Sequence, residues 1–353
     1  MEKYYDGTKL LSMLDIDGHK PEIYMCTTNR TGGKTTYFSR LLVNRFLKQG
    51  KKFALFYRYG YELKDVADKF FKDIGTLFFS GYSMTAMRRA DGKYYELFLH
   101  YPSDAPDFEG WSCGYAIALN ASEPLKKYSH MFSDVDAILF DEFQSESNMY
   151  CANEVGKFIS LHTSIARGQG EQVRYVPVYM LSNPVSIINP YYVEMGISSR
   201  IQKNTHFLRG HGFVLENGFV ESASKAQKES GFNRAFSSNR YVEYANECVY
   251  LNDNKAFIEK PTGRSTYLAT IVYENKSYAI REFSESGILY CDDKTDESFK
   301  FKIAVTTTDH QVNYIMLKTN DGFIMNMRFY FERGCFRFKN LLCKEALLKL
   351  ISY

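Results

Sequence analysis

The chain has 353 residues and a formal net charge of +3 at pH 7, so it is long enough for two domains and lacks a global field that would attract nucleic acid. Its seven cysteines are scattered singly, which is typical of reduced thiols and not of a disulfide framework or a zinc site. The N-terminus has no apolar signal-peptide run, and no stretch approaches about 18 uncharged apolar residues. We therefore expect neither a signal peptide nor a membrane-spanning helix.

The first informative segment is residues 28–36, which read Thr-Asn-Arg-Thr-Gly-Gly-Lys-Thr-Thr. The largely apolar run 22–26 precedes it, and an amphipathic helix is predicted to start near Thr35. This order is that of a P-loop, in which backbone N–H groups and the helix N-terminus bind phosphate. Lys34 would reach the β- and γ-phosphates of a nucleoside triphosphate, and Thr35 would hold Mg²⁺. The candidate nucleotide-binding residues are Thr28, Asn29, Arg30, Thr31, Gly32, Gly33, Lys34, Thr35 and Thr36.

Thr28 is a departure from the P-loop pattern, because the usual motif has a glycine at this place. Gly-Lys-Thr also occurs by chance, so an ordinary turn between a strand and a helix is the alternative. The rest of the chain must decide between the two, since a P-loop ATPase needs a second strand that ends in an acid.

Residues 137–142 supply such a strand, because they read Ala-Ile-Leu-Phe-Asp-Glu and begin with a continuous apolar run. Asp141 and Glu142 then lie at its C-terminal end, where open α/β sheets bind ligands. Asp141 would assist Mg²⁺, and Glu142 would activate the attacking water. An exposed acidic pair after a core strand is the alternative, but the order of the two motifs favours an ATPase.

Two further strands are predicted in the same sheet, at residues 52–59 and 176–181. Asn183 follows the second strand and could bond the γ-phosphate or the attacking water. From residue type alone, a simple turn residue before Pro184 is the favoured interpretation of Asn183.

A helix is predicted at 153–165, and it leads to Arg167 in a glycine-flanked loop. Such an arginine is a candidate arginine finger, which stabilises charge on the transferring phosphoryl group, often in a neighbouring subunit's site. Arg174 and Arg200 compete for this role, and most surface arginines are merely solvated.

Turn signals and a shift in composition divide the rest of the chain into segments. Hairpin turns are predicted at Asp91-Gly92 and Asn217-Gly218, because both dipeptides favour positive φ angles. Residues 222–247 are polar and are interpreted as a linker with one short helix. After the linker, apolar patterning predicts three consecutive strands and a final helix, at 266–273, 276–283, 287–291 and 340–352.

Together, the motifs and their spacing resemble the DNA-packaging ATPases of φ29-like tailed phages, compact relatives of large terminase subunits. The resemblance covers most of the chain. It is carried by the P-loop and by the segments 44–48, 140–143, 153–155, 181–183, 189–191 and 257–260.

The resemblance implies an α/β fold with a P-loop ASCE ATPase domain, built on a central, mostly parallel sheet, and a smaller α+β ribonuclease-H-like domain. We expect the ATPase domain at 1–221, the linker at 222–247 and the second domain at 248–353. The second domain is expected to be inactive as a nuclease, because its first strand, 266–273, contains no aspartate to bind metal.

The resemblance also implies a function. The family forms a ring, usually of five subunits, that docks on the portal protein of an empty capsid and drives double-stranded DNA inward by hydrolysing ATP with Mg²⁺. A packaging RNA can take part, and no membrane is involved. The motor would act in the host cytoplasm, transiently on the viral prohead.

The resemblance also implies roles for individual residues, at the positions of this chain that match the family's motifs. Lys34, Thr35, Asp141 and Glu142 keep the roles given above, Arg167 matches the trans-acting arginine finger, and Asn183 matches the coupling position after the fourth strand. Arg58 is retained and could contact a neighbouring subunit, whereas Gly60 stands where the family has a lysine.

Contact with DNA is predicted at Lys126 and Lys127, because segment 122–128 resembles the family's loop that faces the ring pore. Lysines suit sequence-independent binding of phosphates. A solvated lysine pair is the equal alternative. Two other functions stay open: a terminase-type ATP-dependent nuclease, and a nucleotide-gated capsid assembly factor without sustained turnover.

Overall fold

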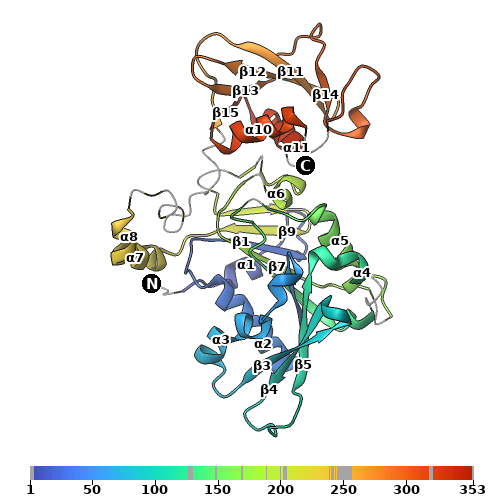
Figure 1. Ribbon diagram of the computed structural model, residues 1–353, viewed down its shortest axis with the longest axis vertical. Coiled ribbons are helices and arrows are strands. Elements are labelled where there is room, and N and C mark those ends of the chain that lie inside the picture. The colour runs from blue at the N-terminus through green and yellow to red at the C-terminus, as the bar shows by residue number, and fades with distance from the viewer. Residues whose placement is uncertain are drawn as a thin grey trace. The chain divides into compact units, whose positions relative to one another are not determined.

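The computed structural model describes residues 4–351 except 126–129, 148, 168–169, 188, 199, 202–204, 238, 240–241, 243, 245–256 and 318–320. Contacts divide the chain into two compact units, Met1–Pro184 with His206–Val249 and Val185–Thr205 with Tyr250–Tyr353 (Figure 1). These units differ from the predicted division at 221, since 185–205 groups with the C-terminal unit. No helix among the described residues is long and apolar enough to cross a lipid bilayer.

The first unit is built on a nine-stranded mixed sheet in the order β3-β4-β5-β2-β6-β7-β1-β9-β8. The strands are β1 (Ile23–Thr27), β2 (Lys52–Tyr57), β3 (Ser83–Arg89), β4 (Tyr94–His100), β5 (Trp111–Ala118), β6 (Val135–Asp141), β7 (Val178–Ser182), β8 (Phe207–Gly210) and β9 (Phe213–Asn217). From β5 to β9 in this order the strands run parallel, as predicted, and antiparallel partners add the edges. The carboxyl ends of β1, β2, β6 and β7 therefore meet at one edge of the sheet, where α/β folds bind ligands.

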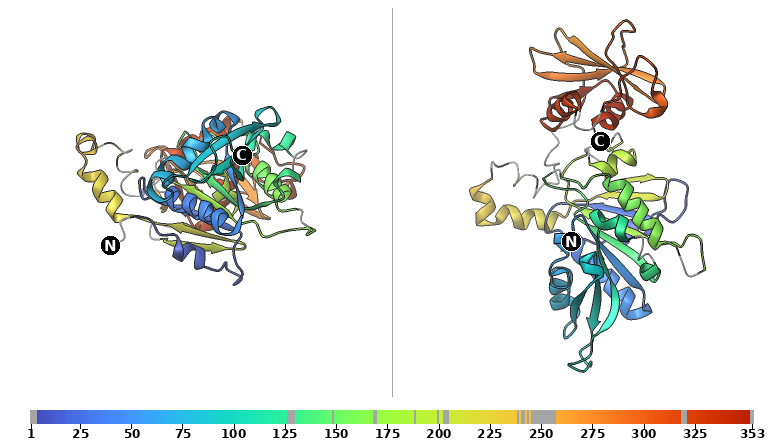
Figure 2. Two further views of the ribbon diagram at one scale, coloured as in Figure 1. Left: turned by 90° about the horizontal axis from the view of Figure 1, so that it is seen from below. Right: turned by 45° about the vertical axis from the view of Figure 1, so that its right-hand side comes forward.

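Helices cover both faces of this sheet (Figure 2). The helices of this unit are α1 (Thr8–Ser12), α2 (Lys34–Gln49), α3 (Val66–Phe78), α4 (Ser122–Leu125), α5 (Glu154–Ile165), α7 (Glu221–Glu229) and α8 (Gly231–Ala235), with 3₁₀ turns η1 (Gly60–Leu63), η2 (Ala90–Gly92) and η3 (Leu119–Ala121). Of these, α7 and α8 project to one side and do not cover the sheet (Figure 1). α2 follows the predicted P-loop directly. It starts after Gly33 and ends at Gly50, and both glycines are left-handed, with φ of 93° and 66°.

The alternation of side chains along β2 explains the two-sided packing. Phe53 points to one face and packs against Phe70 of α3, with ring centroids 5.3 Å apart. Phe56 points to the other face and meets Phe158 of α5 at 6.1 Å. Because both faces are covered by helices, β2 is apolar and buried from Phe53 to Phe56 and not alternately polar.

One of the two predicted hairpins is confirmed and the other is wrong. β3 and β4 pair antiparallel around Asp91-Gly92, as predicted. At Asn217-Gly218, however, no hairpin forms, because β9 pairs antiparallel with the preceding β8 through the turn at 211–212. β9 also runs parallel to β1, and Gly218 donates its N–H to the Thr27 carbonyl at 2.8 Å. Pairing with β1, which is distant in sequence, decides the path of the chain here.

The second unit contains a six-stranded sheet in the order β10-β15-β13-β12-β11-β14. Its elements are α6 (Pro190–Glu194), β10 (Phe257–Ile258), β11 (Thr266–Tyr273), β12 (Lys276–Phe283), β13 (Ile288–Asp292), β14 (Lys302–Ala304), η5 (Thr307–Asp309), α10 (Gly322–Glu332), β15 (Phe336–Phe338) and α11 (Leu341–Ile351). The predicted meander is confirmed in β11, β12 and β13, and the predicted final helix in α11. The parallel addition of β14 to β11 was not predicted.

Candidate functional site

The turn between β1 and α2 is anchored by two buried side chains, Thr28 and Asn29. The Asn29 amide pairs with the backbone of Val220: its Oδ1 accepts the Val220 N–H at 2.8 Å, and its Nδ2 donates to the Val220 carbonyl at 3.1 Å. Thr28 fits in place of the usual glycine because Gly218 faces it, where an added Cβ would lie only 3.1 Å from the Thr28 methyl group. The departure from the motif is therefore accommodated by a glycine far away in the sequence.

Gly32 and Gly33 complete the turn. A Cβ on Gly32 would lie 2.9 Å from a methyl group of Val220, and Gly33 has the left-handed φ of 93°. The N-cap residue of α2 is Gly33, which has no side chain that could cap the first backbone N–H groups of the helix. The turn thus offers a backbone cradle at the positive end of a helix, which suits an anionic phosphate.

Lys34 and Thr35 join this cradle to the neighbouring strands. Lys34 donates from Nζ to Oδ1 of Asn183, beyond β7, at 2.8 Å. Thr35 donates from Oγ1 to Oδ2 of Asp141, at the end of β6, at 2.9 Å. Burial raises the pKa of Asp141 above its usual value, and the Lys34 ammonium opposes that shift. A hydroxyl next to a carboxylate is the oxygen donor set that Mg²⁺ prefers, so the predicted residues fit this ion.

Glu142 follows Asp141 in an unusual backbone conformation. Its φ is 57°, in the left-handed region, which costs roughly 1–3 kcal/mol for a residue other than glycine. Its N–H donates to Oδ1 of Asp141 at 2.9 Å, and its side chain is exposed at the edge of the sheet. The pKa of the Glu142 carboxyl is raised above its usual value. Partial desolvation is the largest cause, and the charge of the nearby Asp141 carboxylate is the next.

Other loop residues contact parts of the chain that sequence reasoning had not connected to the P-loop. Arg30 forms an ion pair with Glu146, whose Oε1 also accepts the Tyr244 hydroxyl at 2.8 Å. Thr31 accepts a hydrogen bond from Gln227 of α7 at 3.2 Å. The segment predicted as a linker therefore includes two helices, α7 and α8, and the first of them touches the loop.

The three candidate arginine fingers differ in their surroundings. Arg174 is buried and donates to the carbonyls of Ile165 and Val135 at 2.9 and 3.3 Å, so it anchors the end of α5 within its own chain. Arg200 groups with the C-terminal unit. Arg167 is exposed just beyond α5 and makes no ion pair with any residue that the structure describes.

Two further predictions concern the DNA contact and a nuclease metal site. Lys126 and Lys127 lie outside the described residues. Within the described part of the chain, the one group of three side chains able to hold a metal ion is Asp15, Asp17 and His19, in the first unit. The described residues of the C-terminal unit contain no such group of three.

The fold and the Lys34–Thr35–Asp141 arrangement define the class of P-loop α/β domains. Residues 2–352 match the family described as Podovirus DNA encapsidation protein (Gp16). The chain therefore belongs to this family.

Curated relatives and solved structures agree with the family. The DNA packaging protein of Bacillus phage phi29 is 25% identical over 327 residues, 90% of each chain, and that of Bacillus phage B103 is 27% identical over 316 residues, 88% of this chain and 91% of the relative. The bacteriophage Phi-29 viral genome packaging motor assembly aligns with a TM-score of 0.56, at 24% identity, over 99% of this chain and 100% of that one. The Phi-28 gp11 DNA packaging motor aligns with a TM-score of 0.59, at 17% identity, over 100% and 99%. These two structures support the fold.

The Asn29–Val220 pairing should contribute to stability. We expect Asn29→Ala to lower the free energy of unfolding of the first unit by about 1–2 kcal/mol, since the hydrogen bond that the buried amide donates and the one that it accepts are both lost. Urea denaturation followed by tryptophan fluorescence measures this, because the single tryptophan, Trp111, lies in β5 of the same unit. The exposed Asn120→Ala is the control, and equal midpoints for the two variants would contradict the prediction.

Proposed function

We propose that this chain is an ATP-hydrolysing motor that moves double-stranded viral DNA into a preformed capsid. The observation that carries the hydrolytic part is the meeting of Lys34, Thr35 and Asp141 at the sheet edge, with Glu142 exposed beside them. The DNA-packaging part is supported by membership of the Gp16 family and by relatives named DNA packaging proteins.

Each of these residues has a separate role in hydrolysis. The Lys34 ammonium and the N-terminus of α2 hold the phosphates, while Thr35 and Asp141 hold Mg²⁺, which neutralises phosphate charge when it is bound. Glu142 polarises the attacking water, and the raised pKa of its carboxyl makes its ionised form a stronger proton acceptor. Arg167 acts on the site of a neighbouring subunit, because it is exposed and is not paired with a described residue of its own chain.

Asn183 is the residue we propose to report the state of the nucleotide. It accepts a hydrogen bond from Lys34, the residue that would contact the β- and γ-phosphates. Phosphate oxygens would compete with Asn183 for the Lys34 ammonium. Binding and loss of the γ-phosphate can therefore change the position of the chain after β7.

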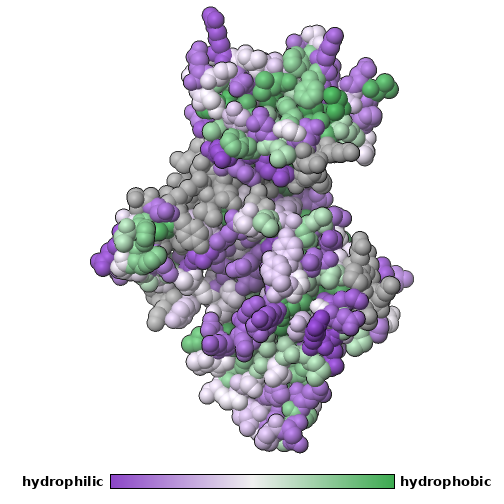
Figure 3. Space-filling model, in the orientation of Figure 1, coloured by the Kyte–Doolittle hydropathy of each residue, from purple (hydrophilic) through white to green (hydrophobic). Residues whose placement is uncertain are grey.

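The partners follow from the same proposal. We propose a ring, of five subunits, that docks on the portal protein of the prohead in the host cytoplasm, with a packaging RNA as a further partner. Exposed aromatic rings at Phe232 of α8 and at Phe236, directly after this helix, form an apolar patch (Figure 3), a kind of surface that marks protein contacts. Lys126 and Lys127 are proposed to hold the DNA backbone.

The C-terminal unit is proposed to be ribonuclease-H-like in fold and inactive as a nuclease. The mixed sheet, with the β11–β12–β13 meander and β14 parallel to β11, supports the fold. The first strand of this unit, β11, contains no aspartate that could bind a catalytic metal, and this supports the inactivity. A nuclease is accordingly not favoured. An assembly factor without turnover is not favoured either, because a nucleotide switch needs no water-activating Glu142.

Steady-state ATPase activity measured against protein concentration, with and without double-stranded DNA, tests the proposal. We expect the rate per subunit to rise with concentration, since Arg167 completes the site of a neighbour, and to rise again with DNA. Lys34→Ala is the inactive control, which excludes a contaminating ATPase. A low rate that is independent of both variables would contradict the motor and favour a nucleotide-binding protein.

A further inference from the structure

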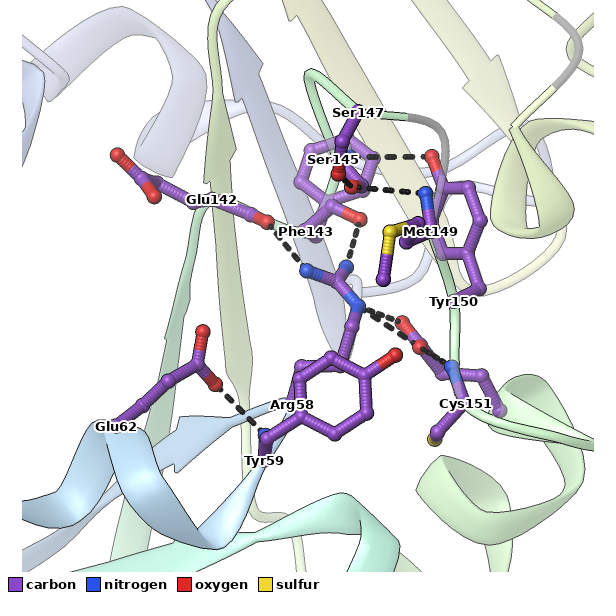
Figure 4. A network of polar contacts seen from close by, with 11 residues as sticks. Arg58, Tyr59, Glu62, Glu142, Phe143, Ser145, Ser147, Met149, Tyr150 and Cys151 are labelled. Atoms are coloured by element: carbon purple, nitrogen blue, oxygen red, sulfur yellow. Dashed lines mark hydrogen bonds and ion pairs between the residues drawn. The ribbon is translucent and has the colours of Figure 1, made fainter.

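The end of β2 carries a buried ion pair beside the proposed catalytic glutamate (Figure 4). Arg58 directly follows β2 and is 7% exposed, and its partner Glu154, the first residue of α5, is 3% exposed. Nε of Arg58 lies 2.8 Å from Oε2 and 3.1 Å from Oε1 of the Glu154 carboxylate. The expectation that Arg58 contacts a neighbouring subunit is therefore not supported, since its guanidinium is occupied within its own chain.

The other guanidinium nitrogens reach the turn that holds Glu142. Nη2 of Arg58 donates to the Phe143 carbonyl at 2.8 Å, and Nη1 approaches the Glu142 carbonyl at 3.5 Å. On the other side of this turn, the Phe143 N–H donates to the Leu181 carbonyl of β7 at 3.2 Å. The left-handed Glu142 is thus held by hydrogen bonds on both sides.

The ion pair is itself fixed by its surroundings. The guanidinium carbon of Arg58 lies 5.0 Å from the ring centroid of Tyr150 and 5.8 Å from that of Phe140. Oε2 of Glu154 also accepts the Cys151 N–H at 2.9 Å. An ammonium at position 58 could pair with Glu154, but it could not reproduce the planar fork that reaches the carboxylate and the carbonyls together.

We propose that Arg58 is a positioning residue for ATP hydrolysis: oriented by Glu154, it holds the Glu142–Phe143 turn so that the Glu142 carboxyl stays beside the phosphate cradle. The inference rests on the proposed function, because it assigns hydrolysis to Glu142. It predicts that a substitution of Arg58 slows the chemical step of hydrolysis and leaves the binding of ATP unchanged. The effect on the chemical step should depend on Glu142.

The test is a double-mutant cycle in the full-length chain. We expect Arg58→Lys to lower kcat for ATP hydrolysis by about 100-fold, the order of loss produced by a misplacement of about 1 Å, with the Kd of a fluorescent ATP analogue changed by less than about threefold. In a Glu142→Gln background, Arg58→Lys should then have no further effect on the residual rate. The matched control is Arg89→Lys, which alters the Arg89–Glu96 ion pair on the β3–β4 hairpin and should leave kcat unchanged.

The outcomes separate this inference from the proposed function. If the wild-type chain hydrolyses ATP and Glu142→Gln does not, a normal kcat in Arg58→Lys overturns the inference alone. Equal losses of kcat in the Glu142 and Glu142→Gln backgrounds overturn it too, because Arg58 would then act on structure in general. If Glu142→Gln retains full activity, the proposed role of Glu142 fails first.

Loss of one charge could also unfold the chain, because it leaves the other charge buried and unpaired. The variant Arg58→Gln with Glu154→Gln removes both charges together and avoids this. It should unfold at nearly the wild-type urea concentration and bind the ATP analogue normally, yet show the same loss of kcat as Arg58→Lys. Retention of wild-type kcat in this folded double variant would overturn the inference.

Discussion

Glu142→Gln is expected to bind ATP with wild-type affinity and to hydrolyse it about 10³-fold more slowly. The amide has the same size, and the side chain is exposed, so neither the fold nor the phosphate cradle should change. The amide cannot accept a proton from the attacking water. Steady-state phosphate release gives kcat, and titration with a fluorescent ATP analogue gives Kd.

The control for this substitution is Glu109→Gln, which alters an exposed carboxyl between β4 and β5. Its kcat should equal that of the wild type. Undiminished hydrolysis by Glu142→Gln would remove Glu142 from the mechanism and would make a general base elsewhere necessary.

Mixing two inactive variants should restore activity if Arg167 acts between subunits. Lys34→Ala removes the proposed phosphate-binding cation and Arg167→Ala removes the proposed finger, so each variant alone should lose about 10³-fold in kcat. In rings assembled from equal amounts of both, about a quarter of the sites combine an intact Lys34 with an intact Arg167 from the neighbour. The mixture should therefore reach up to about a quarter of the wild-type rate of ATP hydrolysis if the sites act independently of one another.

Two controls make this mixing experiment decisive. Arg264→Ala alters an exposed arginine of the C-terminal unit and should retain the wild-type rate. Cross-linking between differently tagged subunits should establish that mixed rings form. No recovery of ATPase activity in such verified rings would exclude a finger that acts in trans.

Much of the site was predictable because the residues of a P-loop ATPase site lie in short sequence motifs. Gly-Lys-Thr opens a helix, and the apolar run of β6 ends in Asp141-Glu142. Since parallel strands bring their carboxyl ends to one edge, these two motifs were expected to meet, and the 2.9 Å contact between Thr35 and Asp141 fulfils that expectation. Asn183 was less certain from its residue type, and its contact with Lys34 brings it into the same group.

Other features had no local signal. The pairing of Asn29 with Val220 joins residues 191 positions apart, and the Arg58–Glu154 ion pair joins residues 96 positions apart. An asparagine in a turn or an arginine after a strand has many ordinary roles, so neither partner could be named in advance. The predicted hairpin at Asn217-Gly218 was wrong for the same reason, because pairing of β9 with β1 outweighed the local turn preference.

The sequence by itself determined the class of the first unit, the positions of several of its core strands along the chain and the meander of the second unit, and it predicted which residues would form a phosphate and metal site. These depend on local periodicity and on short motifs, which act over a few neighbouring residues. Only the tertiary structure decided how Thr28 is accommodated by Gly218, why Arg174 is anchored, and what holds Glu142 in a left-handed conformation. These depend on groups that the packing of the sheet brings together from distant parts of the chain, and burial makes their hydrogen bonds obligatory.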